Sequence, residues 1–193
     1  MTLTKTHRRG VVVDEAVLDA TLALLAEHGF GFNVEDVAER AGVHKTTVYR
    51  RWDTKPLLVA AAIQRFAVQT VDIRRSGDTV ADLRHLAVQV ARVLRSATGR
   101  NLLHATLTAT GSVPELTDIA RDFFIGRYAQ ATLLITDGQA QGSIRPDVDP
   151  VLIWQAIVNP LHMNAICELE TSDQLARTLT DLILDGARRH ADY

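Results

Sequence analysis

The chain has 193 residues, 47% of them hydrophobic and only 5 of them proline, which favours a globular protein with a sizeable core over a disordered chain. Its formal net charge of -2 excludes a general attraction to phosphate, so any nucleic-acid binding requires a local group of Lys and Arg side chains. The single cysteine, Cys167, excludes an internal disulfide framework, and no apolar run reaches the ~18 residues of a membrane span, so we expect a soluble, cytoplasmic protein.

Apolar residues recur at helical spacing along almost the whole chain, and no segment alternates as a half-buried strand does. The predicted fold class is therefore all-α. The first helix is expected over about residues 12–28, with Gly29 as its left-handed stop. Asp14 and Glu15 would then lie in its first turn, where the helix dipole favours acidic side chains.

Two short helices are predicted next, with almost no chain between them. Asn33 followed by Asp36 has the spacing of a capping box and predicts a helix that ends at Gly42. The second short helix is expected over about residues 45–52, and a longer one begins near Pro56, since proline is tolerated in a first turn. Two short helices joined so tightly must cross at a steep angle, as in a helix-turn-helix motif.

A connection is predicted at residues 74–78, because Gly77 interrupts the helical pattern and Thr79 restarts it. Five further helices are expected, near residues 79–98, 101–110, 113–141, 150–169 and 172–190. Three of their starts carry capping signals: Ser112 with Glu115, Asp149 with Pro150, and Thr171 with Gln174.

The second short helix carries polar residues on the face opposite its apolar side. Val48 and Trp52 fall where this helix would be buried against its neighbours. Basic, hydroxyl and phenol groups on a helix narrow enough for the major groove suit phosphate and base-edge contacts. The segment from His44 to Lys55 contains four basic side chains, those of Lys45, Arg50, Arg51 and Lys55, and one acidic side chain, that of Asp53. It is therefore a basic patch in an acidic protein. We predict the following DNA-binding residues: Lys45, Thr46, Thr47, Tyr49, Arg50, Arg51 and Lys55.

A specific set of residues runs through this segment: Glu27-His28-Gly29-Phe30, Ala38, Ala41-Gly42-Val43, Thr47, Tyr49, Trp52, Lys55 and Leu58. The set resembles the N-terminal DNA-binding domain of the tetracycline-repressor (TetR) family of bacterial regulators. The stretch from Gly142 to Pro150, followed by Asn159-Pro160-Leu161, is similar to one type of C-terminal domain in that family. Three positions depart from the family pattern: Glu35 replaces a residue that is basic in some relatives, His44 a common serine cap, and Thr46 a frequent glycine.

The resemblance implies a homodimer with a helix-turn-helix DNA-binding domain at residues 1–55 and an effector-binding and dimerisation domain at residues 56–193. It implies that the first three helices of each subunit enter DNA and that the last two helices pair across the two-fold axis. It also implies that Lys45, Thr46 and Thr47 approach bases, and that phosphates are held by Tyr49, Arg51 and Lys55. The expected partners are a double-stranded DNA operator with two-fold symmetry, a second copy of the chain, and a small-molecule effector.

Apolar residues at one-turn spacing in the last two helices provide a candidate dimer interface. We predict it to contain Trp154, Ile157, Val158, Leu161, Leu175, Leu179, Leu182 and Gly186. The alternative is that these residues form an ordinary core.

Polar and aromatic residues scattered through the other apolar helices suggest a pocket for a mostly apolar ligand. The candidates are His104, Thr108, Phe124, Tyr128, Trp154, Asn159, His162 and Met163. Pro160 adds to this case, because a proline inside a helix removes one amide and bends the axis. The alternative is a filled core in which the polar groups satisfy one another.

No metal, cofactor or catalytic activity is expected. His85, His104 and His162 lack the close pairing of a zinc site, and no nucleotide-binding loop or nucleophile elbow is present. Two functions remain open: a ligand-responsive repressor or activator, most simply a repressor released from DNA by a small ligand, and a constitutive DNA-organising protein that has no effector.

Overall fold

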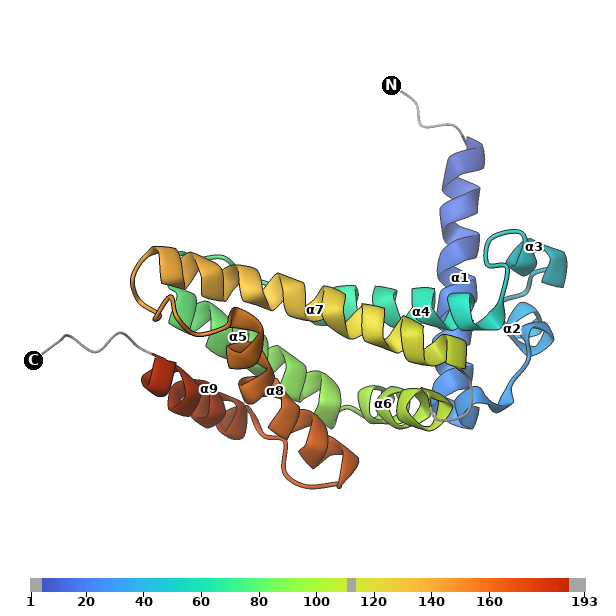
Figure 1. The fold of residues 1–193 in the computed structure, drawn as a ribbon. Coiled ribbons are helices and arrows are strands. Elements are labelled where there is room, and N and C mark those ends of the chain that lie inside the picture. The colour runs from blue at the N-terminus through green and yellow to red at the C-terminus, as the bar shows by residue number, and fades with distance from the viewer. Residues whose placement is uncertain (1–4, 111–113, 188–193) are drawn as a thin grey trace, which may run out of the picture. The chain divides into compact units, whose positions relative to one another are not determined.

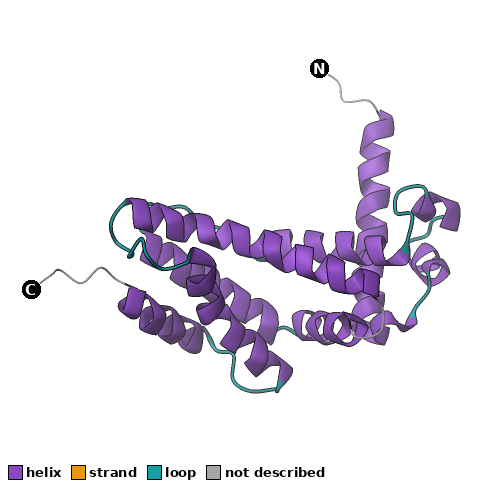
Figure 2. Ribbon diagram, viewed as in Figure 1, coloured by secondary structure: helices purple, strands orange, loops and turns teal. Residues whose placement is uncertain are grey.

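The structure is a computed structural model that describes residues 5–110 and 114–187 (Figure 1). Within these ranges all regular secondary structure is helical, which confirms the predicted all-α class (Figure 2). The elements are α1 (Lys5–His28), the short 3-10 helix η1 (Gly29–Gly31), α2 (Val34–Arg40), α3 (Lys45–Tyr49), α4 (Lys55–Thr70), α5 (Thr79–Arg95), α6 (Ala97–Thr110), α7 (Pro114–Ala140), α8 (Pro150–Ile166) and α9 (Asp173–Ala187). No helix in the described part is both long and apolar enough to span a membrane.

The predicted start of the first helix was wrong. The helix α1 begins at Lys5, so Asp14 and Glu15 lie well inside it and no acidic residue occupies its first turn. Lys5, Arg8 and Arg9 are good helix formers and no proline interrupts residues 5–11, so the helix extends over Gly10 toward the N-terminus. Asp14 is therefore available for a tertiary contact.

Two of the capping predictions are confirmed. Asn33 and Asp36 form the full capping box, in which the Asp36 amide donates to Asn33 Oδ1 at 2.9 Å and the Asn33 amide donates to Asp36 Oδ2 at 2.7 Å. Asp149 caps α8 by accepting from the Val151 amide at 2.8 Å. The Ser112 signal lies outside the described residues.

The predicted cap of the last helix was wrong by one residue. Ser172, not Thr171, accepts from an amide of the first turn of α9, that of Leu175, at 3.1 Å. Thr171 is buried instead, with 8% of its surface exposed. Adjacent hydroxyl residues offer the same local signal, and burial decides between them.

The chain divides into two compact units. The first is drawn from Met1–Ala67 and Asn101–Arg121, and the second from Val68–Arg100 and Asp122–Tyr193. The core of the first unit joins α1, α2, α3, α4 and α6 through a cluster of buried side chains that includes Val17, Leu25, Val37, Val48, Leu58 and Leu102. This cluster fixes α2 and α3 against α1. Gly42, at φ +66°, provides the turn between the two short helices.

In the second unit α5 packs against α8 and α9. Its fully buried side chains include Leu83, Ile135, Ile157, Leu161 and Leu184. Ion pairs reinforce the contact between α5 and α9: Arg92 binds Asp173 at 2.6 Å, and Arg95 binds the same carboxylate at 3.1 Å. The Arg92 hydrogen bond lowers the pKa of Asp173, so this carboxylate stays charged at neutral pH.

Candidate nucleic-acid interface

The exposed side of α3 is the candidate DNA-binding surface. Val48 is completely buried, so its insertion into the core orients the helix. The side chains of Lys45, Thr46, Tyr49 and Arg50 are exposed, and we call these four residues the recognition face. Thr47 is half-buried at the edge of the helix. A core that fixes one side of a short helix and leaves polar groups on the other provides a preformed surface for a DNA groove.

The N-terminus of α3 has no side-chain cap. His44 takes the cap position with extended backbone angles, but its side chain makes no capping hydrogen bond. The turn is closed by the backbone alone, since the Thr47 amide donates to the His44 carbonyl at 2.8 Å. Histidine at this position therefore leaves the helix without the capping bond that a serine side chain could accept.

Lys45 on the recognition face contacts an acidic residue of the preceding helix. Its ammonium lies 3.4 Å from Glu35 Oε1, and both side chains are more than half exposed, at 60% and 53%. Such exposed pairs contribute at most about 1 kcal/mol. Lys45 is therefore free to exchange Glu35 for a DNA group at little cost.

Arg51 has a different environment from the recognition face. Its guanidinium forms an ion pair with Asp14 of α1, and only 23% of its side chain is exposed. This pair ties the turn after α3 to the middle of α1. A helix that begins near residue 12 places Asp14 in its first turn, so this contact was not predicted from the sequence.

Lys55, at the start of α4, is held by groups of the α1–α2 connection. Its ammonium donates to the carbonyl of Phe30 at 2.6 Å and to that of Phe32 at 2.5 Å. It also lies 4.4 Å from the centre of each phenyl ring. Burial lowers the pKa of Lys55, while the charge of Asp36 raises it. Two of its three N–H groups thus brace the N-terminus of α4, and the third remains for an external acceptor.

A second group of predicted residues meets in the second unit. The ring of Phe124 on α7 lies 6.1 Å from that of Tyr128 and 5.9 Å from that of His162 on α8. The Tyr128 hydroxyl donates to Asn159 Oδ1 at 3.2 Å. We call these four residues the α7–α8 cluster. They combine flat apolar faces with polar atoms, as ligand sites do.

The polar atoms of the α7–α8 cluster have defined states. His162 Nδ1 lies 2.9 Å from the Val158 carbonyl, so it carries the proton, and Nε2 of the neutral ring is an acceptor. Burial lowers the pKa of His162, although the bond to Val158 raises it, so the ring is neutral at pH 7. Burial raises the pKa of Tyr128. The cluster therefore carries no net charge.

The other predicted effector residues lie elsewhere. Trp154 is buried at 3% exposure, whereas Met163 is 58% exposed. His104 is exposed and belongs to the first unit. The side chain of Thr108 is outside the described part of the structure. Helical spacing alone could not separate these residues from the α7–α8 cluster, because the cluster depends on how α7 and α8 meet.

The residues predicted for a dimer interface fall into two groups. Four residues of α8 lie in the interior of the second unit with 0–3% of their surface exposed: Trp154, Ile157, Val158 and Leu161. On α9, Leu182 is 66% exposed, Gly186 is exposed, and Leu175 and Leu179 are half-buried. Apolar residues outnumber polar ones on α8 and are spread around the helix, so its sequence could not show which of them face inward.

No three His, Cys, Asp or Glu side chains among the described residues are arranged to hold a metal ion.

Comparison with known proteins identifies both parts of the chain. Residues 17–62 match the family described as bacterial regulatory proteins, tetR family, and residues 73–183 match the tetracyclin repressor-like C-terminal domain. The HTH-type transcriptional regulator AqdR of Rhodococcus erythropolis is 30% identical over 182 residues, which are 92% of this chain and 86% of AqdR.

Solved structures with the same fold cover nearly the whole chain. The TetR family transcription regulator SCO0332 has a TM-score of 0.75 and 26% identity, over 92% of this chain and 99% of its own. The regulator FadR from Bacillus subtilis, solved in complex with stearoyl-CoA, has a TM-score of 0.73 and 18% identity, over 90% of this chain and 99% of its own.

Proposed function

This chain belongs to the TetR family of helix-turn-helix transcriptional regulators, and we propose that it acts within that family as a dimeric repressor that a small, mostly apolar ligand releases from its operator. The observation that carries the proposal is the recognition face, an exposed polar surface on a helix that the core, Lys55 and the Arg51–Asp14 pair hold in place. A rigid surface of this kind suits specific contacts with bases.

In the proposed complex α3 enters the major groove, and the DNA-binding domain comprises residues 1–55. Lys45, Thr46 and Thr47 approach base edges. Phosphates are contacted by Tyr49, Arg50, Arg51 and the third N–H of Lys55. Phosphate contacts position the helix and base contacts provide the sequence preference.

The proposed dimer forms through the C-terminal domain, residues 56–193. One helix-turn-helix makes few base contacts, and dimers contact two half-sites related by symmetry. Leu182 of α9 is 66% exposed and Leu152 of α8 is 58% exposed, so both apolar side chains are available for a second copy. The buried α8 residues support the interface from within.

The proposed effector binds at the α7–α8 cluster. The cluster offers aromatic faces, a neutral His162 acceptor and the amide of Asn159 as a donor. These groups suit an apolar ligand with one or two polar atoms. FadR, whose fold this chain shares, is a regulator solved with an acyl-CoA ligand.

The DNA-binding mode predicts a specific effect of Arg50→Ala. Arg50 is exposed and its side chain packs in no core, so the change should leave the free energy of unfolding within about 0.5 kcal/mol of its original value. It should weaken operator binding and reduce the slope of log K against log salt concentration by about one unit, because one phosphate contact is lost. Titrations at several salt concentrations measure the slope, and an unchanged slope would place Arg50 away from the phosphates.

The effector site predicts a loss of ligand response in His162→Leu and Asn159→Leu. Compounds that raise the melting temperature of the wild-type protein and release it from DNA should do neither with these variants, while DNA binding without a compound stays unchanged. Thr136→Val, on an exposed position of α7, is the matched control and should respond as the wild type does. If the wild-type protein bound operator DNA and no compound in a broad apolar library affected it, the constitutive alternative would be favoured.

A further inference from the structure

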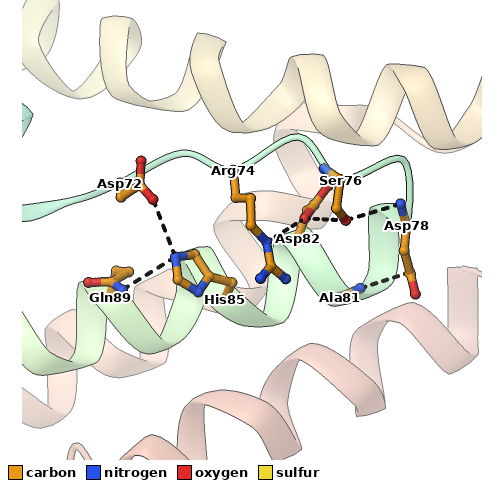
Figure 3. Close-up of polar contacts among 8 residues, drawn as sticks. All are labelled: Asp72, Arg74, Ser76, Asp78, Ala81, Asp82, His85 and Gln89. Atoms are coloured by element: carbon orange, nitrogen blue, oxygen red, sulfur yellow. Dashed lines mark hydrogen bonds and ion pairs between the residues drawn. The ribbon is translucent and has the colours of Figure 1, made fainter.

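The segment between α4 and α5, residues 71–78, is attached to α5 by one buried carboxylate (Figure 3). Asp82, in the first turn of α5, is only 2% exposed. Its Oδ1 accepts from Arg74 Nε at 3.1 Å and from the Ser76 hydroxyl at 2.8 Å, and its Oδ2 accepts from the Ser76 amide at 2.6 Å. All three donors belong to the connecting segment, and we call this arrangement the Asp82 clamp.

The clamp is not needed to start the helix. Asp78 already caps α5 by accepting from the Ala81 amide at 3.0 Å. Gly77, at φ +92°, provides the turn between the capping residue and Ser76. Capping thus accounts for Asp78 and leaves the burial and bonding of Asp82 unexplained by local structure.

Further contacts hold the segment on both sides of Ser76. Asp72 Oδ2 lies 3.9 Å from His85 Nε2 of α5, and Arg75 lies 3.6 Å from Asp137 of α7. Val71 is buried, at 8% exposure. Arg75, Asp137 and Asp72 are each more than half exposed, so both contacts are weak and the Asp82 clamp is the strongest restraint on this segment.

The clamp is charged and therefore costly to open. Burial alone would raise the pKa of Asp82. The hydrogen bonds from Ser76 and Arg74 and the positive charge of Arg74 lower it by more than burial raises it, so the net shift is downward. Withdrawal of these donors would leave a buried carboxylate without partners, which is strongly unfavourable. A connection that would otherwise be mobile, as most loops are, is thereby fixed.

The fixed segment follows directly on α4, the helix whose other end is braced by Lys55. We propose that Asp82 is a positioning residue for DNA binding: by fixing residues 71–78 it fixes the chain that follows the end of α4, and so sets how strictly the dimer discriminates between half-site spacings. The proposal rests on the dimeric function proposed above. Asp82 touches no DNA in it and acts through the rigidity of the connection.

The test compares operators of different spacing. An operator is first selected with wild-type protein from random DNA, and the spacing between its half-sites is then lengthened or shortened by one base pair. Each step shifts a half-site by about 3.4 Å along the helix. The wild-type protein should lose about tenfold or more in affinity at each altered spacing, whereas Asp82→Asn should lose less than about threefold. Asp137→Asn removes an exposed partner of the same segment and should discriminate as the wild type does.

The outcomes separate the two proposals. A folded Asp82→Asn protein that keeps the wild-type spacing preference overturns the role of Asp82 and leaves the proposed function intact. Wild-type protein that selects no two-fold sequence overturns the proposed function and this inference with it. If Asp82→Asn fails to fold, the double variant Arg74→Gln with Ser76→Ala removes two of the three donors and keeps the carboxylate. It should lose the spacing preference, and retention of that preference would likewise overturn the proposal.

Discussion

Leu182→Glu is expected to convert the protein into a monomer and to weaken operator binding by about 100-fold or more. Leu182 is 66% exposed, so the substitution removes no core packing and should leave the protomer folded. A charge within an apolar interface must be desolvated on assembly, and a two-fold symmetric interface would contain two copies of it. Without the dimer each protein contacts one half-site only.

Sedimentation velocity at micromolar concentration measures the assembly state, and circular dichroism confirms that the variant is folded. Arg177→Glu is the control: it adds a glutamate at another exposed position of α9, five residues and about 140° around the helix from Leu182. It should remain dimeric. A monomeric wild-type protein, or a dimeric Leu182→Glu protein, would contradict the proposed interface.

Lys55→Met should lower the free energy of unfolding by about 2 kcal/mol, which corresponds to a fall of about 4–8 °C in melting temperature. Methionine keeps most of the apolar stem but leaves the carbonyls of Phe30 and Phe32 without their donor. Burial lowers the pKa of Lys55, and because the same desolvation offsets part of the stabilisation by these bonds, we expect the loss to be smaller than their sum. Operator affinity should fall as well, with a salt slope lower by about one unit.

Arg50→Ala provides the comparison for Lys55→Met, since both variants remove one cation near the DNA surface. Only Lys55→Met should destabilise the protein, because only Lys55 is bonded to buried backbone groups. Equal unfolding free energies in the two variants would show that the hydrogen bonds of Lys55 to Phe30 and Phe32 do not stabilise the protein.

The parts of the fold that the sequence predicted depend on local signals. The Asn33–Asp36 capping box, the Gly42 turn and the Asp149 cap are each contained within a few residues, and the structure confirms all three. The family resemblance of the helix-turn-helix segment rests on the same short range. Local hydrogen bonds leave a clear trace in sequence because they fix residue type and spacing together.

The tertiary contacts that hold the candidate site in place could not be predicted from local signals. Lys55 binds backbone carbonyls, which have no residue-type signature, and Arg51 binds Asp14 across a helix whose start was misplaced. The donors and the acceptor of the Asp82 clamp are close in sequence, but such groups are usually exposed, and only burial makes this set a restraint. The α7–α8 cluster likewise depends on tertiary packing rather than on spacing along either helix.

Hydroxyl-radical footprinting of the wild-type protein on a selected operator tests the central claim most directly. The account predicts two protected patches of related sequence, arranged with two-fold symmetry and separated by one or more helical turns of about 34 Å each. The same patches should disappear with Leu182→Glu. Protection that extends evenly along the DNA whatever its sequence would contradict the account and identify a DNA-organising protein instead.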